Sequence, residues 1–319
     1  MADLRRVKAL IKNEKGSALV ILALTMSVLA GVTALVADVG VAYVTQQRLS
    51  VVADAASLAG GQELHRGATQ ARAAALANAA RNGISPEKMQ VAVGQNNQSL
   101  SVRIMAPMHS FFGQVLGFRG GELAAAAKVV RGAPTARTGL APLAIQEQDF
   151  SFGKLYTLKF GAGENENAGL GPGNFGILAL GGTGADRYRN NLTNGYPGLI
   201  EIGDVLDTQT GNISGATRKA IKERFARCRE RCPGGLCSHE TATPDCPRLL
   251  IVPVFRPPQN SEKQVESVVV TGFAAFHAET IPGSGQDSFI TGRFIRIHSG
   301  GPVDLGGSDF GVSGTKMVE

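Results

Sequence analysis

The sequence has no tryptophan, and it lacks the short motifs that mark common catalytic sites. It contains no G-x-S-x-G nucleophile elbow. Its glycine-rich runs at 169–176 and 181–186 carry no G-K-S/T and do not fit G-x-G-x-x-G. The 5 histidines are scattered, and Asp204, Asp207 and Asn212 do not follow the spacing of a calcium loop. We therefore expect no enzyme activity, no catalytic residue and no cofactor.

A strong charge of one sign is also missing beyond the first residues. The formal net charge is +6. Within residues 1–16, five basic residues against two acidic ones leave a local excess of three positive charges. The other three excess charges are spread over the rest of the 319 residues, which gives no case for nucleic-acid binding.

Charge is absent altogether from residues 17–37, a run of 21 residues that reads SALVILALTMSVLAGVTALVA. About 20 apolar residues span a bilayer as a helix. The basic residues before the run are expected to stay in the cytoplasm, which places residue 38 onward outside. The sequence thus predicts a single-pass protein of the cytoplasmic (inner) membrane, with a cytoplasmic tail at 1–16 and the lipid bilayer as a partner. A cleaved secretory signal, whose apolar core is about 7–15 residues long, is the competing interpretation.

The helix is predicted to continue beyond the bilayer. No proline interrupts residues 38–59, and apolar residues recur there at steps of three to five until Gly60-Gly61 offers a stop. We expect one helix from Ser17 to Ala59, with residues 38–61 as an extramembrane segment. The stripe Val41, Val44, Leu49 and Val52 is expected to pack on a partner or on a second copy, or on the chain's own C-terminal part.

Residues 15–61 resemble the N-terminal module of TadG-like (TadE/TadG-like) proteins of the Flp, or tight-adherence, pilus-assembly machinery. That module has a glycine, an apolar span and a pattern close to D-x-G-x-x-Y-x-x-x-x-R-L-x-x-x-A-D-A-A-x-L-A-G. The matching residues are Gly16, Asp38, Gly40, Tyr43, Arg48, Leu49, Asp54, Ala55, Ala56, Leu58 and Gly60.

The resemblance implies a membrane-anchored structural or assembly component of a Flp type IV pilus or a related secretion apparatus. It implies other pilus-assembly or pseudopilin proteins as partners, and no catalysis. Pilin-like proteins of related systems are cut after a glycine and carry Glu five residues beyond the cut. Ile21 stands at that position after Gly16, so we expect an uncleaved anchor. The alternative function is a surface-binding or adhesin-like domain tethered by a Tad-type anchor.

The remainder predicts an α+β fold in further parts. Residues 62–131 read as a small pilin-like α+β unit: an alanine-rich helix over 64–82, a hairpin turning around 95–98, and a strand or helix over 122–132. Residues 132–142 read as a linker. Residues 143–319 read as a β-rich extracytoplasmic domain, because runs rich in β-branched residues alternate with Gly, Pro or Asn clusters. One helix is expected there, over 217–232.

All 4 cysteines lie within an insertion at 226–247. Outside the membrane an even, clustered set favours two disulfides. Cys228 and Cys232 are four apart on one helix face, a spacing that disfavours a mutual bond, so we expect nested pairs, Cys232 with Cys237 and Cys228 with Cys246. A zinc ion held by all four thiolates is the alternative, although the eight-residue gap before Cys246 is long for such a site.

Overall fold

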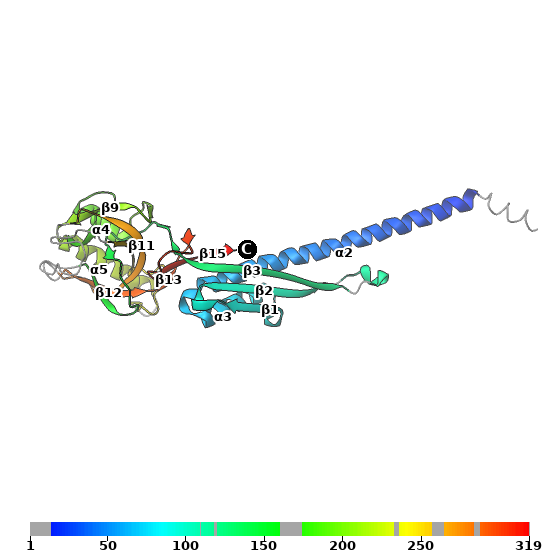
Figure 1. The fold of residues 1–319 in the computed structure, drawn as a ribbon, viewed down its shortest axis with the longest axis horizontal. Coiled ribbons are helices and arrows are strands. Elements are labelled where there is room, and N and C mark those ends of the chain that lie inside the picture. The colour runs from blue at the N-terminus through cyan, green and yellow to red at the C-terminus, as the bar shows by residue number, and fades with distance from the viewer. Residues whose placement is uncertain are drawn as a thin grey trace, which may run out of the picture. The chain divides into compact units, whose positions relative to one another are not determined.

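The computed structural model describes residues 14–108, 110–117, 120–159, 174–232, 236–256, 265–283 and 288–318 (Figure 1). Most of the expected cytoplasmic tail, residues 1–13, and the first part of the glycine-rich run at 169–176 lie outside the described residues. The chain divides into two units. The first holds residues up to 56 with 76–91 and 102–127, and the second holds 57–75, 92–101 and everything from 128 onward.

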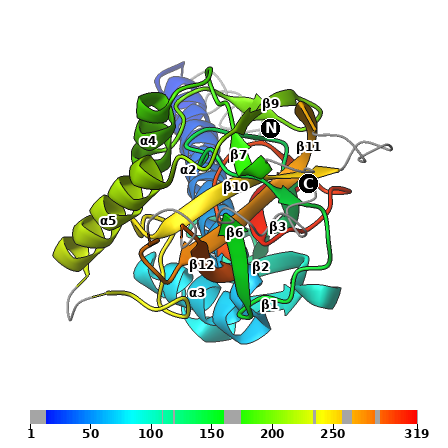
Figure 2. The ribbon, with the colours of Figure 1, turned by 90° about the vertical axis from the view of Figure 1, so that its left-hand side faces the viewer.

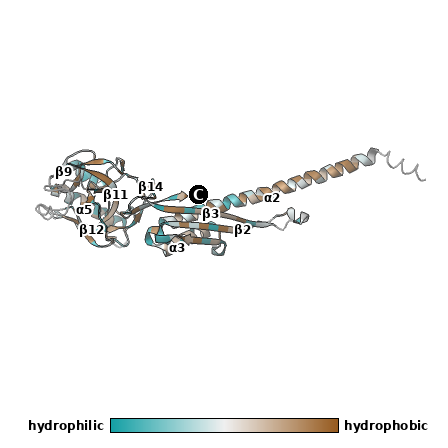
Figure 3. Ribbon diagram, viewed as in Figure 1, coloured by the Kyte–Doolittle hydropathy of each residue, from teal (hydrophilic) through white to brown (hydrophobic). Residues whose placement is uncertain are grey.

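The N-terminal helix α2 runs from Glu14 to Gln62 without a break. The expected continuous helix over 17–59 is therefore confirmed. By length and composition this helix is able to cross a membrane, and Figure 3 shows its hydrophobic colouring over the apolar run. Side chains from 17 to 33 are all exposed, whereas Leu49, Val52, Ala53 and Ala56 further along are buried.

Small residues allow close packing where α2 ends. An added Cβ at Gly60 would lie 2.6 Å from Leu100 Cδ1 and 2.8 Å from the Ala71 carbonyl oxygen, so a side chain does not fit there. A short 3₁₀ turn, Leu64–Arg66, then leads into helix α3, Ala68–Arg81. The alanine-rich helix expected over 64–82 is confirmed.

The expected hairpin is formed by β1, Met89–Val93, and β2, Ser99–Met108. The turn between them uses Asn96 and Asn97, both at φ 55°, a left-handed conformation that asparagine tolerates. Residues 122–132, which fitted either a strand or a helix, are a strand: β3 runs from Gly121 to Pro134.

The sheet that contains this hairpin also takes in the end of the chain. Its order is β1-β2-β3-β15-β13, with β14 pairing β3 as well. Strand β15, Val312–Val318, pairs antiparallel with β3, from Gly314 opposite Gly132 to Val318 opposite Lys128. Residues 132–142, expected to be a linker, are partly strand: β3 continues to Pro134 and β4 covers Ala136–Arg137.

A second sheet has seven strands in the order β5-β10-β11-β12-β6, with β9 pairing both β11 and β7 (Figure 2). Its centre is the antiparallel pair β10 and β11, from Leu249 opposite His277 to Arg256 opposite Val269. The β-rich interpretation of residues 143–319 is confirmed by these strands. Their bounds are Ile145–Gln146 (β5), Leu155–Lys159 (β6), Asn174–Leu178 (β7), Val205–Thr210 (β9), Leu249–Arg256 (β10), Ser267–Ala278 (β11) and Ile290–Ile295 (β12). Shorter strands are Ile200–Glu201 (β8), Ile297–His298 (β13) and Val303–Asp304 (β14).

Two helices, α4 (Ala185–Asn194) and α5 (Ser214–Arg231), lie side by side against this sheet (Figure 2). The helix expected over 217–232 is α5, and Ile221, Phe225 and Cys228 on its inner face are buried. Both helices contribute to one core cluster with sheet residues such as Leu250 and Phe276. Helix α4 has no counterpart in the sequence prediction, because only Tyr188 and Leu192 carry its apolar face and glycines precede it.

Candidate functional site

Asp38 follows the uncharged run directly, and its carboxylate is bound by a loop from the β2–β3 connection. Ser110 Oγ donates to Oδ2 at 2.6 Å, and the backbone N–H groups of Phe111 and Gly113 donate at 2.9 and 2.8 Å. The N–H of Phe112 also faces the carboxylate, 3.1 Å from Oδ2. The Ser110 hydroxyl and then these N–H groups lower the pKa of Asp38 to about 2, although burial alone would raise it. Asp38 therefore holds the loop Ser110–Gly113 against α2.

Two further side chains of α2 bind backbone oxygens of neighbouring elements. Arg48 Nη2 donates to the carbonyl of Asn82, just after α3, at 3.3 Å. Gln46 Nε2 donates to the carbonyl of Ala124 in β3 at 2.9 Å. The Arg48 guanidinium suits its place at the end of α3, because the last carbonyl groups of a helix lack partners. These contacts fix residues 46–48 of α2 to the elements that follow it.

The other motif residues divide into packed and open positions. Leu49 and Ala56 are buried, Ala55 and Leu58 are half-buried, and Asp54 is half-buried with its own interactions. Tyr43 is 65% exposed. An added Cβ at Gly16 or Gly40 would meet no atom within 4 Å, so nothing within the described residues requires glycine at these two positions.

Residues 16–63 match a protein-family model, Tad, described as "Putative Flp pilus-assembly TadE/G-like". The chain carries a Tad domain. The resemblance drawn from the sequence over residues 15–61 is thereby confirmed. The Tad domain corresponds closely to α2, Glu14–Gln62, and it includes Asp38, Arg48 and Gly60. No curated protein and no solved structure matches the chain significantly.

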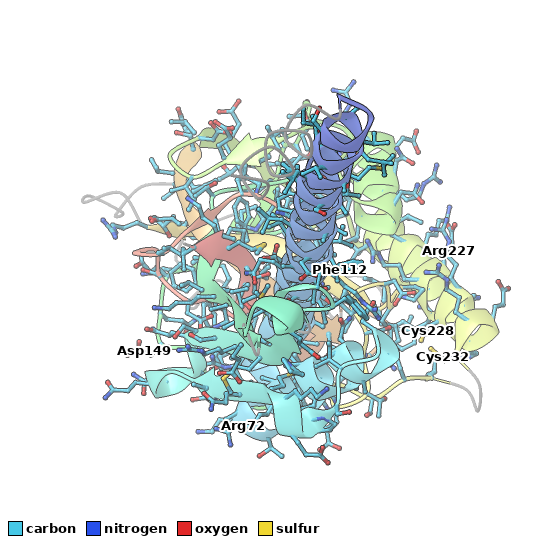
Figure 4. The ribbon with its side chains drawn as sticks, turned by 90° about the vertical axis from the view of Figure 1, so that its right-hand side faces the viewer. Arg72, Phe112, Asp149, Arg227, Cys228 and Cys232 are labelled. Carbon is cyan, nitrogen blue, oxygen red and sulfur yellow. The ribbon has the colours of Figure 1, made fainter. Side chains whose placement is uncertain are left out.

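The four cysteines lie outside the Tad domain, at the end of α5 and in the segment after it. Figure 4 labels Cys228 and Cys232. The Sγ atom of Cys228 is 3.7 Å from that of Cys232 and 3.3 Å from that of Cys237. The Sγ atoms of Cys237 and Cys246 are 2.7 Å apart. A disulfide bond is about 2.05 Å long, and all four residues are free cysteines here. The four thiols lie together, as their positions in the sequence predict, but the pairs Cys228–Cys246 and Cys232–Cys237 stay a prediction.

Each thiol in this cluster affects the ionisation of the next. The hydrogen bond with Cys228 raises the pKa of Cys232 to about 11, and burial raises the pKa of Cys237 to about 12. Burial also raises the pKa of Cys246. Burial would raise the pKa of Cys228 too, but the backbone N–H of Cys237 and the neighbouring thiols outweigh it and lower that pKa.

Three groups beside the cysteines were missed by sequence reasoning. His277 in β11 is fully buried, with Nε2 3.8 Å from Cys237 Sγ. Arg248 Nη1 donates to the Cys237 carbonyl at 2.7 Å, and Arg224 Nη1 donates to the Pro247 carbonyl at 2.7 Å. No local signal marked His277, which is 40 residues from Cys237. Arginine side chains are mostly exposed in folded proteins, yet Arg224 and Arg248 are 8% and 5% exposed.

A buried lysine has a structural explanation. Lys159 Nζ donates to Asn212 Oδ1 at 2.6 Å and to the Ser288 carbonyl at 3.1 Å. Burial lowers its pKa to about 8. Because its donors are used within the fold, Lys159 joins β6 to the loops around it.

Proposed function

We propose that this protein is a membrane-anchored structural or assembly component of a Flp (tight-adherence) pilus or a related secretion apparatus, without catalysis. The Tad domain at residues 16–63 carries this proposal. Residues 17–37 cross the cytoplasmic membrane once, the N-terminus stays in the cytoplasm, and everything after residue 38 lies outside. The positive excess before the apolar run supports this orientation.

The extramembrane part of α2 offers the surface for pilus-assembly proteins or for a second copy. Of the stripe expected to meet a partner, Leu49 and Val52 are buried within the chain, which corrects that expectation. Val41 and Val44 are 45% and 66% exposed, and Val51 is 64% exposed. These three valines are spaced by three and seven, so they share one helix face. A partner that covers these valines removes their apolar area from water, which stabilises the contact by about 25 cal/mol per Å².

Val44→Asp tests this surface, with Gln47→Asp as a matched control that adds the same charge at an exposed polar position. In a pilus-producing host we expect Val44→Asp to insert in the membrane normally but to lose crosslinks to neighbouring proteins and to lower pilus output. Gln47→Asp should leave both unchanged. Unchanged crosslinks and pilus output in Val44→Asp would contradict the proposed surface.

Orientation is tested separately, with a reporter that fluoresces only in the cytoplasm. A fusion after Glu319 should be dark, because the proposed topology places that end outside. A bright fusion would overturn the topology.

The second candidate is a surface-binding or adhesin-like domain tethered by the Tad segment. It draws on the observation that residues 64–319 lie outside the family match. Deleting the gene separates the two functions. Loss of pili supports the assembly role, whereas normal pili with weaker attachment to surfaces supports the binding role.

A further inference from the structure

The cysteine cluster has the arrangement of a metal site more than that of two disulfides. The ligand atoms of Cys228, Cys232 and Cys237 lie within 4.8 Å of one another, and so do those of Cys237, Cys246 and His277. Cys237 is therefore close to all three other thiols at once. A tetrahedral zinc ion with Zn–S bonds of about 2.3 Å places its sulfur atoms about 3.8 Å apart. The separations of 3.7 and 3.3 Å are near this value, and the 2.7 Å pair would have to open. Cys246 does not share a group with Cys228 and Cys232, so its sulfur would also have to move toward theirs.

The charges around the cluster favour bound metal over two disulfides. The guanidinium groups of Arg224 and Arg248 are buried beside it, and their hydrogen bonds go to carbonyl oxygens, among them those of Pro247 and Cys237. Within the described residues neither forms an ion pair with a carboxylate. Buried cations are costly unless an anion compensates them. Two disulfides, or four thiols, are neutral, whereas four thiolates around a divalent ion carry a net charge of about −2.

Donors to the sulfur atoms are also in place. The backbone N–H of Cys237 faces the Cys228 sulfur, and the backbone N–H of Arg248 faces the Cys246 sulfur. His277 is fully buried, and its Nδ1 has no partner among the described atoms. Its Nε2 points toward Cys237 Sγ at 3.8 Å. Such outer groups orient and stabilise thiolate ligands.

We propose that Cys228, Cys232, Cys237 and Cys246 together bind one divalent metal ion of the zinc class as thiolates. Arg224 and Arg248 balance the charge of the site, and the imidazole of His277 donates a hydrogen bond to the Cys237 thiolate. Binding involves no oxidation or reduction: the thiol protons pass to the solvent as the four metal–sulfur bonds form. The site and the disulfide pairs expected from the sequence exclude each other.

The test uses the full chain, extracted in detergent without chelator or added metal. We expect one zinc per chain by elemental analysis, and four alkylatable thiols after denaturation in chelator. Replacement by cobalt should give the intense sulfur-to-cobalt absorption of a tetrahedral thiolate site. Because the chain has only 4 cysteines, that absorption has one possible source.

Two variants complete the test. Cys246→Ser should lower zinc stoichiometry and change the cobalt spectrum. His277→Gln should keep the metal but raise its rate of loss to a chelator. Two disulfides by non-reducing peptide mapping, or metal content that Cys246→Ser leaves unchanged, would overturn the proposal.

A second inference concerns the loop that Asp38 holds. Phe111 and Phe112 are adjacent in the sequence, and they are 67% and 51% exposed. Their backbone N–H groups bind the Asp38 carboxylate. Asp38 is the first residue after the uncharged run, so it lies where the helix leaves the hydrocarbon core. The two phenylalanines are thus held at the level of the membrane surface.

We propose that Phe111 and Phe112 insert into the outer headgroup layer of the bilayer, next to the helix that anchors the chain. The phospholipid surface is the occupant that this location favours, since the carboxylate fixes the loop at the depth of residue 38. Asp38 is a positioning residue in this arrangement, and its loss releases the loop without removing the anchor.

The absence of tryptophan makes this inference directly measurable. Phe112→Trp places a sole tryptophan in the loop, and Leu199→Trp places one at an exposed position of the second unit. In phospholipid vesicles we expect Phe112→Trp to emit at shorter wavelength and to be quenched by lipids brominated near the headgroup. Leu199→Trp should be quenched by iodide in the water instead.

Adding Asp38→Ala to Phe112→Trp should weaken the quenching by lipid, while the protein stays in the membrane. The proposal fails if Phe112→Trp is quenched by iodide as readily as Leu199→Trp, or if Asp38→Ala leaves its quenching by lipid unchanged.

Discussion

The Tad helix and the cysteine segment bury charge in opposite ways. On α2 the buried carboxylate of Asp38 accepts hydrogen bonds from a hydroxyl and three backbone N–H groups, all within the chain. Beside the cysteines two cations, Arg224 and Arg248, donate to carbonyl oxygens, and Arg248 also lies over the Phe225 ring. Hydrogen bonds occupy Nε and Nη1 of both guanidiniums. Within the described residues no carboxylate neutralises their formal charge, and the thiols would do so by ionising. A buried charge whose partners all come from the chain needs nothing else to stabilise the fold. A buried charge without a countercharge indicates that a ligand supplies one.

The largest loss of stability is expected where a substitution buries a new charge without a partner. Val52 is 4% exposed on α2, and Val52→Asp should lower the free energy of unfolding by about 3–5 kcal/mol, because the carboxylate is buried without donors. Val44→Asp on the exposed face should change stability by about 0.5 kcal/mol or less. Thermal unfolding of the detergent-extracted protein measures both. Equal effects would mean that the two faces of α2 are not distinct.

The next prediction concerns the cations. Arg224→Met should destabilise the second unit by about 1–3 kcal/mol, since it leaves the carbonyl oxygens of Leu192, Pro247 and Leu249 without their donor. It should also speed the loss of zinc to a chelator, because one compensating charge is removed. Arg229→Met, at an exposed arginine of the same helix, is the control. If Arg224→Met makes the protein more stable, the cation was not compensated in the native state.

A smaller, pH-dependent effect is expected from the Asp38 carboxylate. The folded-state pKa of Asp38 is about 2, below its ordinary value of 3.8. A lowered pKa stabilises the native contact above the unfolded value and loses that contribution as pH falls through the folded one. The loop should therefore detach between about pH 4 and pH 2, as the emission of Phe112→Trp would report. In Asp38→Asn this transition should be missing; a persisting transition would assign it to another group.

The last prediction is of no change. Because Ile21 stands where processed pilin-like chains carry Glu, the intact mass of membrane-extracted protein should include residues 1–16. A mature chain that begins at Ser17 would show that processing does not require Glu at that position.

Local patterns were sufficient for elements that depend on neighbouring residues. The uncharged run and the spacing after it predicted α2, and alternation around Gln95 predicted the hairpin of β1 and β2. The family pattern marked Asp38, but its role required Ser110, which is 72 residues away. The inner face of α2 was predicted only in part, since spacing alone does not tell which valines a sheet will cover.

Elements that depend on distant partners were not predictable in the same way. Helix α4 carries too few apolar residues to show a period, and it is stable because Tyr188 and Leu192 enter a core built from later strands. The cysteines were placed together because they are close in sequence. His277 reaches them only through the register of β11 with β10, in which it lies opposite Leu249.

The pairing of β15 with β3 has a consequence for how the chain is made. The edge of β3 from Lys128 to Gly132 takes its partner from Gly314–Val318, which are synthesised about 180 residues later. At about 5–20 residues per second, roughly 10–40 s separate the synthesis of the two strands. During that interval the edge of β3 stays unpaired, and open edges are prone to pair with other chains. A chain built this way needs that edge protected until β15 is synthesised, and a stop codon before Gly314 should leave the edge unpaired permanently.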